Sequence, residues 1–340
     1  MIKEAIANLV AGKSLTMDEA AAVMDEIMEG QVTPAQFGAF VIALRMKGET
    51  VEEIAGLAKT MRANALQVRT SGPVVDTCGT GGDSSATFNI STTAAFVAAG
   101  AGLKVAKHGN RAISSQSGSA DVLEALGVRL DMTAEEVGRC LEEVGIGFMF
   151  APAFHPAMKY AAAPRREIGV RTVFNILGPL TNPAGAKAQV LGVFDGSLVD
   201  KMAEVLRLLG CQHALVVHGE DGLDEITVTG KSQVSELKNG NITSYTVTPE
   251  EFGMSLAEPG SLKGGSAAEN AVILRDILGG APGARRDVVL LNAAAALVAG
   301  DKVTSLKDGV EMAEKSIDSQ QALGKLEQMI AFSRNLPPRT

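Results

Sequence analysis

The sequence has few cysteines and no spacing of them that would build a disulfide framework or a metal centre. Its three cysteines, Cys78, Cys140 and Cys211, lie far apart and are odd in number. A C-x-x-C pair, an H-E-x-x-H motif and a nucleophile elbow are also absent. This pattern disfavours a disulfide-stapled secreted fold, and we predict a reducing, cytoplasmic location.

The sequence also lacks long apolar runs and any excess of positive charge. The apolar runs Val288 to Leu291 and Ala293 to Ala299 are interrupted by Asn292 and are too short to span a bilayer. The N-terminus lacks the hydrophobic region of a signal peptide. The formal net charge is -8 and the pI is about 5.2, so no basic field attracts nucleic acid or anionic lipid. We therefore expect no membrane segment and no nucleic-acid partner.

The first 65 residues or so carry three copies of one helix-start signature, a threonine followed three places later by Glu or Gln. The pairs are Thr16 with Glu19, Thr33 with Gln36, and Thr50 with Glu53. Behind the second start, helical spacing predicts one apolar face made of Phe37, Phe40, Val41 and Leu44. Four short helices bury little surface alone, so we expect this layer to pack on the rest of the chain or on a second copy of itself.

From Gly72 onward, strand patterns alternate with helix patterns, which is typical of a mostly parallel sheet. The candidate strands are Val74 to Thr77, Leu103 to Lys107, Ile146 to Phe150, Gln189 to Phe194, Ala214 to His218, Ile226 to Val228 and Ile242 to Val247. The candidate helices are 91–100, 119–127, 133–144 and 199–209, and a helix start at Thr248 to Glu251 leads into a mainly helical C-terminal part. With 340 residues and 46% hydrophobic content, the chain is large enough for two domains.

The predicted fold class is therefore α/β. A small all-helical N-terminal domain, residues 1–70, would precede a larger α/β domain, residues 71–340, in which helices flank a mostly parallel central sheet. Helices from about 133–185 are candidates to join this helical domain. We expect the helical domain to mediate dimerisation.

The stretch Asp76 to Asp83 follows the first predicted strand and places three glycines in the turn before a helix. Glycine backbone can close on an anion, and the helix N-terminus adds unpaired N–H donors and partial positive charge. The stretch Asn89 to Thr92 adds small polar side chains at that helix start. These features predict a phosphate cradle; the alternative is a tight strand-to-helix connection with an ordinary cap and no ligand.

A second polar loop follows the next strand. Lys107 to Arg111 and the run Ala112 to Asp121 offer two cations, several hydroxyls and a second helix N-terminus. Two anion cradles on neighbouring strands indicate a doubly phosphorylated ligand, although a solvated polar loop is the alternative. Asp224 and Glu225, after the strand Ala214 to His218, are adjacent acids suited to Mg²⁺, or they form only a solvated turn.

Several cationic side chains remain ambiguous at this level. An arginine near an apolar pocket can hold a carboxylate by two parallel hydrogen bonds, yet Arg165, Arg166 and Arg171 are equally suited to structural salt bridges. His108 and His155 are candidates for an acid or base, or for hydrogen-bonding fixtures.

Taken together, these motifs resemble the anthranilate phosphoribosyltransferases of tryptophan biosynthesis, within the nucleoside phosphorylase-like phosphoribosyltransferases. The motifs are Gly79 to Asp83, Asn89 to Thr92, Lys107 to Arg111, Ser114 to Asp121, Arg165 with Asn175 to Pro183, and Asp224 with Glu225. The resemblance covers nearly the whole chain. One departure is that Pro164 directly precedes Arg165, where the family pattern leads us to expect the proline one place earlier.

The resemblance implies a homodimer through the helical domain, Mg²⁺ dependence, and transfer of a phosphoribosyl group from 5-phosphoribosyl 1-diphosphate to anthranilate. It assigns the diphosphate substrate to Gly79, Gly82, Asp83, Thr87, Asn89, Ile90, Ser91, Thr92, Lys107, His108, Gly109, Asn110, Arg111, Ala112, Ile113, Ser114, Ser115 and Ser119. It assigns Mg²⁺ to Ser91, Asp224 and Glu225, and anthranilate to Gly79, Asn110 and Arg165.

The chemistry expected from this resemblance needs no essential general base, because an aromatic amine is neutral at pH 7 and already nucleophilic. Lys107 and His108 are then positioning groups. Two alternatives stay open: a pyrimidine nucleoside phosphorylase-like enzyme, in which the lysine loop normally reads differently, and a non-catalytic relative that binds nucleic acid.

Overall fold

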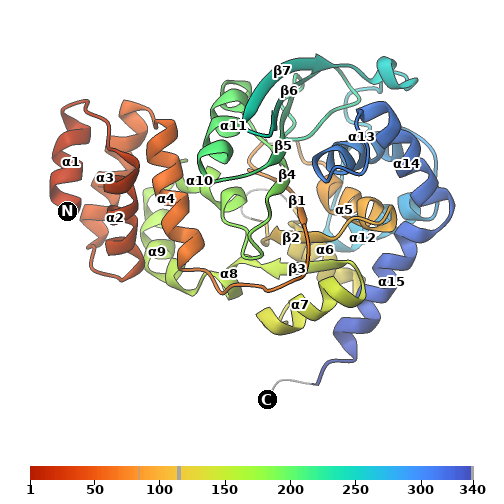
Figure 1. Ribbon diagram of the computed structural model, residues 1–340, viewed down its shortest axis with the longest axis horizontal. Helices are drawn as coiled ribbons and strands as arrows, with labels where there is room; N and C mark the ends of the chain where they lie inside the picture. The colour runs from red at the N-terminus through yellow and green to blue at the C-terminus, as the bar shows by residue number, and fades with distance from the viewer. Residues whose placement is uncertain (84, 113–115, 338–340) are drawn as a thin grey trace.

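The structure, a computed structural model, describes residues 1–83, 85–112 and 116–337. Its centre is a seven-stranded sheet with the strand order β3-β2-β1-β4-β5-β6-β7 (Figure 1). The strands are β1 (Val75–Gly79), β2 (Val105–Gly109), β3 (Ile146–Phe150), β4 (Ala188–Gly192), β5 (His213–Gly219), β6 (Ser232–Lys238) and β7 (Asn241–Val247). The first five pair in parallel and the last two antiparallel, so the predicted mostly parallel sheet is confirmed.

Helices cover both faces of the sheet because alternate side chains of each buried strand point to opposite faces. In β5, Leu215 and Val217 join one apolar core, and Ala214 and Val216 join the other. The first core packs against α5 (Ile90–Gly100), α13 (Ala284–Ala299) and their neighbours on the right of Figure 1. These neighbours are α6 (Ser119–Leu126), α7 (Ala134–Glu143), α12 (Ala267–Leu278), α14 (Leu306–Asp318) and α15 (Gln321–Arg334).

The other core joins α11 (Val199–Leu208) to the N-terminal helical layer. That layer contains α1 (Ile2–Val10), α2 (Met17–Met28), α3 (Pro34–Lys47) and α4 (Val51–Ala63), drawn on the left of Figure 1. All three predicted capping boxes are present, and the predicted apolar face of α3 is buried. The helical layer therefore forms as the sequence pattern indicates.

The segment between β3 and β4 connects the two parts of the molecule. It contains α8 (Ala151–Phe154), α9 (Lys159–Ile168) and α10 (Phe174–Leu177). Helix α9 packs on α2 and α3, whereas α7 packs on β3. The guanidinium of Arg62, at the end of α4, donates to the carbonyls of Leu180 and Leu209 at 2.5 and 3.1 Å. Of the helices between about 133 and 185, α9 and α10 thus join the helical layer.

Two element predictions were wrong, and one strand was not predicted. Ile226 to Val228 is buried but forms no strand, because side chains and a neighbouring loop bind its backbone in place of a second strand. β6 was missed because its sequence, SQVSELK, is largely polar. The capping box at Thr248 is present, yet the helix is a four-residue 3-10 turn that ends at Gly253, whose φ of 76° stops it.

The order of the strands fixes where a site can form. Starting from β1, the chain builds β2 and β3 to one side and β4 and β5 to the other, so the connections diverge between β1 and β4. In parallel sheets, ligands bind beyond the carboxyl ends of the strands at such a divergence. Among the described residues, no helix is both long and apolar enough to cross a membrane.

Candidate active site

Asp224 lies directly against the carboxyl ends of β1 and β4. A Cβ atom on Gly79 would lie 2.2 Å from Asp224 Oδ2, and one on Gly192 would lie 1.6 Å from the Asp224 carbonyl oxygen. Separations this short are not tolerated between non-bonded atoms. Glycine at the ends of both strands is therefore what admits this acid to the divergence point of the sheet.

The two adjacent acids bind N–H groups in the glycine turn and at the N-terminus of α5, the two parts of the predicted phosphate cradle. Gly81, at φ 65°, donates its backbone N–H to Asp224 Oδ2 at 2.7 Å. Ser91, in the first turn of α5, donates its N–H to Glu225 Oε1 at 3.1 Å. The acids thus lie within hydrogen-bonding distance of both the glycine turn and the helix N-terminus, where negatively charged oxygens are favoured.

Burial makes both acids hard to ionise. It raises the pKa of Asp224 to about 6, with a further contribution from the charge of Asp83. Burial also raises the pKa of Glu225 to about 8, and the neighbouring charge of Asp224 adds to this effect while Lys107 opposes it. A cation bound beside two such carboxyl groups would favour their ionised forms.

The donor set at this position fits Mg²⁺. That ion takes one or two carboxylates and completes its shell with hydroxyl, phosphate and water oxygens. Asp224 and Glu225 supply the carboxylates, and Ser91, whose backbone N–H binds Glu225, supplies a hydroxyl. Within the described ranges, no group of three His, Cys, Asp or Glu residues is arranged to hold a metal by protein ligands alone.

Lys107 joins the second loop to the first. Its side chain is buried, and Nζ donates to the Thr77 carbonyl at 2.5 Å and lies 3.5 Å from Ser91 Oγ. Burial lowers the pKa of Lys107, while the charges of Asp76 and Glu225 oppose that shift. An ammonium group held here, beside the N-terminus of α5, favours an anionic ligand.

Asp76 was not predicted as a site residue, yet it organises the strand ends. Its buried carboxylate accepts the backbone N–H of His108 at 3.2 Å and the side-chain amide of Asn182 at 2.7 Å. The same Asn182 amide donates to the Ala106 carbonyl at 2.8 Å. The signal that could have identified Asp76 is its position, because it is an acidic residue inside a predicted strand, just before the glycine-rich turn.

His108 and His155 face each other, with ring centroids 5.1 Å apart. Burial lowers the pKa of His108 to about 3, helped by His155, and lowers that of His155 to about 4. Both rings are therefore neutral at pH 7. In the described part of the chain, the Nε2 atom of each ring is buried without a hydrogen-bond partner, so two acceptors or donors remain for a ligand.

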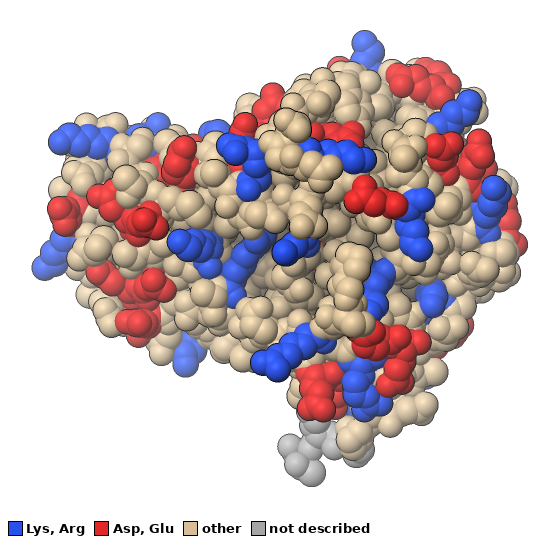
Figure 2. All heavy atoms as spheres, viewed as in Figure 1, with Lys and Arg blue, Asp and Glu red and all other residues tan. Residues whose placement is uncertain are grey.

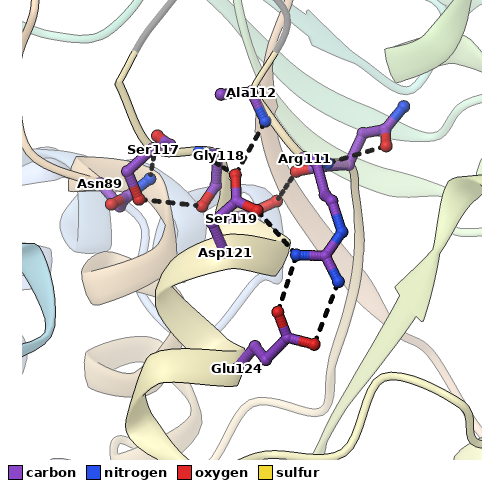
Figure 3. Close-up of polar contacts among 9 residues, drawn as sticks. Asn89, Arg111, Ala112, Ser117, Gly118, Ser119, Asp121 and Glu124 are labelled. Atoms are coloured by element: carbon purple, nitrogen blue, oxygen red, sulfur yellow. Dashed lines mark hydrogen bonds and ion pairs between the residues drawn. The ribbon is translucent and has the colours of Figure 1, made fainter. Parts of the chain in front are cut away.

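The second loop is held together by its own acids, as Figure 3 shows. Asp121 accepts the backbone N–H groups of Ala112 and Gly118, each at 2.9 Å. The guanidinium of Arg111 points to Asp121 and Glu124, with contacts between 2.7 and 3.0 Å. Hydrogen bonds from these donors lower the pKa of Asp121 against the effect of its partial burial. Arg111 thus fastens the loop to α6.

The remaining residues predicted for the diphosphate substrate lie around these two loops. Asn89 donates to the Ser117 carbonyl at 3.0 Å, and the Ser119 hydroxyl donates to the Asn110 carbonyl at 3.3 Å. Thr87 forms an antiparallel bridge with Lys263. Ile90 and Thr92 are buried in the first turn of α5, and Gly109 ends β2. Ile113, Ser114 and Ser115 fall outside the described residues.

Two arginines extend the site toward the helical layer. Arg165, in the last turn of α9, is half-buried, and its guanidinium lies over the Phe174 ring at 5.3 Å. Burial lowers the pKa of this group. Arg171 donates to the Gly82 carbonyl and lies over the Phe194 ring at 4.5 Å. In Figure 2, Lys and Arg side chains gather around a hollow between the helical layer and the α/β part.

Comparison with known proteins agrees with this geometry. Residues 71–323 match the glycosyl transferase family a/b domain, and residues 3–65 match the glycosyl transferase family helical bundle domain. An anthranilate phosphoribosyltransferase from Dehalococcoides mccartyi is 59% identical over 338 residues, which cover 99% of each chain. The chain belongs to the anthranilate phosphoribosyltransferase family.

Members of this family from other organisms give the same result. The relative from Symbiobacterium thermophilum is 57% identical, with 98% of each chain covered. A crystal structure of anthranilate phosphoribosyltransferase from Thermus thermophilus has a TM-score of 0.92 at 48% identity and covers 97% of this chain and 99% of its own. The Saccharomyces cerevisiae protein in complex with PRPP and Mg has a TM-score of 0.90 at 29% identity, with 98% of each chain covered. The anthranilate phosphoribosyltransferase family members are pentosyltransferases, and this chain is an enzyme of that type.

Proposed function

We propose that the chain transfers the phosphoribosyl group from 5-phosphoribosyl 1-diphosphate to the amino group of anthranilate. The products are N-(5-phosphoribosyl)anthranilate and diphosphate, in L-tryptophan biosynthesis. The observation that carries this proposal is the position of Asp224 and Glu225, which bind the N–H groups of Gly81 and Ser91 and so lie between the glycine turn and the N-terminus of α5. The structures of the Saccharomyces cerevisiae protein in complex with PRPP and Mg, and in complex with 4-fluoroanthranilate, support it.

In this proposal, the two loops hold the two ends of one sugar phosphate. The diphosphate substrate is bound by the glycine turn, the α5 N-terminus, Lys107 and the loop that follows it. Its ligands are Gly79, Gly82, Asp83, Thr87, Asn89 to Thr92, Lys107 to Ser115, and Ser119. Ser91, Asp224 and Glu225 hold Mg²⁺. Backbone N–H groups at a helix N-terminus stabilise phosphate charge without any change in protonation.

The hard step is the departure of diphosphate from C1 of the ribose through an oxocarbenium-like state. Bound Mg²⁺ supplies a positive charge that stabilises the departing diphosphate. The chain contributes the Lys107 ammonium, which the Thr77 carbonyl holds in place, and the amides of the glycine turn. The Gly81 amide becomes free for the diphosphate when Asp224, its present acceptor, turns to the cation. Holding both substrates in line supplies in principle up to ~7 to 11 kcal/mol of the barrier reduction.

Anthranilate needs placement and no strong base. Its aromatic amine is neutral at pH 7, so it attacks C1 directly. His108, whose pKa is lowered to about 3, is neutral, and its unpartnered Nε2 is suited to orient the amine. Gly79, Asn110 and Arg165 bind anthranilate, with the Arg165 guanidinium facing its carboxylate.

The direct test follows the fluorescence of anthranilate in the presence of purified protein, Mg²⁺ and phosphoribosyl diphosphate. The proposal predicts that this fluorescence is lost, and that loss requires both Mg²⁺ and the diphosphate substrate. No change with freshly purified protein would reject the proposal. Phosphate-dependent release of free base from a pyrimidine nucleoside would favour a phosphorylase, and a salt-sensitive shift of labelled DNA would favour a nucleic-acid-binding relative.

We further propose a cytoplasmic homodimer, with residues 1–70 as the helical domain and 71–340 as the catalytic domain. Met1, Val10 and Met46 are exposed apolar residues on the helical layer, with 56%, 74% and 84% of their surface accessible. A second copy of the layer is the partner that would cover them. Light scattering should give twice the monomer mass, and Val10→Glu with Met46→Glu should reduce it toward the monomer value.

A further inference from the structure

Asn292 is a buried polar residue in an otherwise apolar stretch of α13. Residues Val288–Ala299 are all buried, and Asn292 is the one residue among them with a polar side chain. Only 2% of its surface is accessible. A buried amide destabilises a fold unless its hydrogen-bonding groups find partners, so the partners of Asn292 indicate its role.

Those partners are on the acidic loop. Ile226 donates its backbone N–H to Asn292 Oδ1 at 3.0 Å, and Asn292 Nδ2 donates to the Ile226 carbonyl at 2.8 Å. The second Nδ2 hydrogen goes to the Val288 carbonyl at 2.8 Å. Both amide donors are therefore used, and one amide side chain binds both backbone groups of Ile226.

This contact constrains the backbone of Glu225, the residue before Ile226. The N–H bound by Asn292 belongs to the peptide plane that joins Glu225 to Ile226. Ile226 lies outside any strand, so a sheet ladder does not fix that plane. On the other side of the loop, Gly79 and Gly192 allow Asp224 to lie against the ends of β1 and β4. The acid pair is thus held between the strand ends and α13.

We propose that Asn292 is a positioning residue that fixes the peptide plane after Glu225 and thereby sets the divalent-cation affinity of the Asp224–Glu225 pair. This inference rests on the proposed function, which assigns a cation to that pair. It adds a residue on the core side of α13, remote in sequence from every predicted ligand. Partners of metal ligands typically change metal affinity by about 10- to 100-fold when they are removed.

The test uses Mn²⁺ as the probe, in the presence of inorganic diphosphate, with free Mn²⁺ measured by electron paramagnetic resonance. In Asn292→Leu, both backbone groups of Ile226 lose their partner. Asn292→Ser is gentler, because a helix serine can bond the carbonyl four residues earlier, here that of Val288. Ser316→Ala is the matched control, since its buried hydroxyl donates to the Val97 carbonyl on the same side of the sheet.

We expect Mn²⁺ to bind at least about 10-fold more weakly to the Asn292 variants, with KM for anthranilate at saturating Mg²⁺ unchanged. Ser316→Ala should keep the wild-type affinity. Wild-type Mn²⁺ affinity in either folded Asn292 variant would overturn the inference and leave the proposed function intact. Failure of Glu225→Gln to weaken Mn²⁺ binding would instead reject the cation site, and with it both proposals.

Discussion

Gly81 and Asp224, which are 143 residues apart in the sequence, are joined by a 2.7 Å hydrogen bond from the Gly81 N–H to Oδ2. This bond connects the glycine turn after β1 to the acidic loop after β5. The Asp224 carboxylate uses a donor that we propose for a phosphate oxygen. A ligand that binds here must therefore rearrange the acid pair or bridge it through a cation.

Replacing Asp224 by Asn and Glu225 by Gln should lower Mg²⁺-dependent turnover on the order of 100-fold or more, because the cation contributes several kcal/mol of charge stabilisation. The unfolding temperature at pH 8 should stay the same or rise, since burial and mutual repulsion penalise ionisation of the native pair. Glu220→Gln, an exposed acid of the same loop, is the control. Turnover near the wild-type rate in the double variant would contradict the cation assignment.

Gly192→Ala should displace Asp224, because its Cβ would lie 1.6 Å from the Asp224 carbonyl oxygen. We expect a loss of about 1 to 3 kcal/mol in the free energy of unfolding and a loss of kcat/KM on the order of 100-fold, since small misplacements of catalytic groups are costly. Gly230→Ala is the matched control, because a Cβ there would meet no atom within 4 Å. Denaturant titrations and initial rates measure both effects; equal behaviour of the two variants would show that the close approach is unimportant.

The paired histidines should make the protein sensitive to acid. In the folded state, the pKa values of His108 and His155 are lowered to about 3 and about 4, below the usual 6.5 of an unfolded chain. The unfolded chain therefore binds more protons between about pH 3 and 6.5, and stability falls as the pH drops through that window. His155→Gln should remove up to about 3 kcal/mol of this loss at pH 4. Urea titrations at pH 7 and pH 4 check the prediction, which fails if wild type and variant lose stability equally.

Arg165→Ala should mainly raise KM for anthranilate, because its half-buried guanidinium is the proposed partner of the substrate carboxylate. Affinity for phosphoribosyl diphosphate should stay near the wild-type value. Arg166→Ala, which removes the exposed neighbouring guanidinium, is the control. Separate substrate titrations measure the two affinities, and an equal loss of both in Arg165→Ala would count against the assignment.

Local patterns in the sequence predicted much of the fold. Capping boxes and helical spacing gave the N-terminal helices, and apolar runs gave the parallel strands, because both signals come from residues close together in the chain. The strand prediction failed where the backbone hydrogen bonds of a segment are made with residues that lie outside that segment. The segment Ile226 to Val228 is made of β-branched residues, as strands often are, but Asn292, Ser232 and Ala257 supply its hydrogen bonds.

The sequence by itself determined the helical layer, the alternating α/β pattern and the polar turns that follow the strands. These features depend on backbone preferences and on apolar spacing within short windows. Only the tertiary structure decided that Asp224 lies against Gly79 and Gly192, that Asp76 holds the loop of His108, and that Asn292 holds the acidic loop. Those contacts join residues far apart in the chain, and they exist only after parallel strands bring their carboxyl ends to one edge of the sheet.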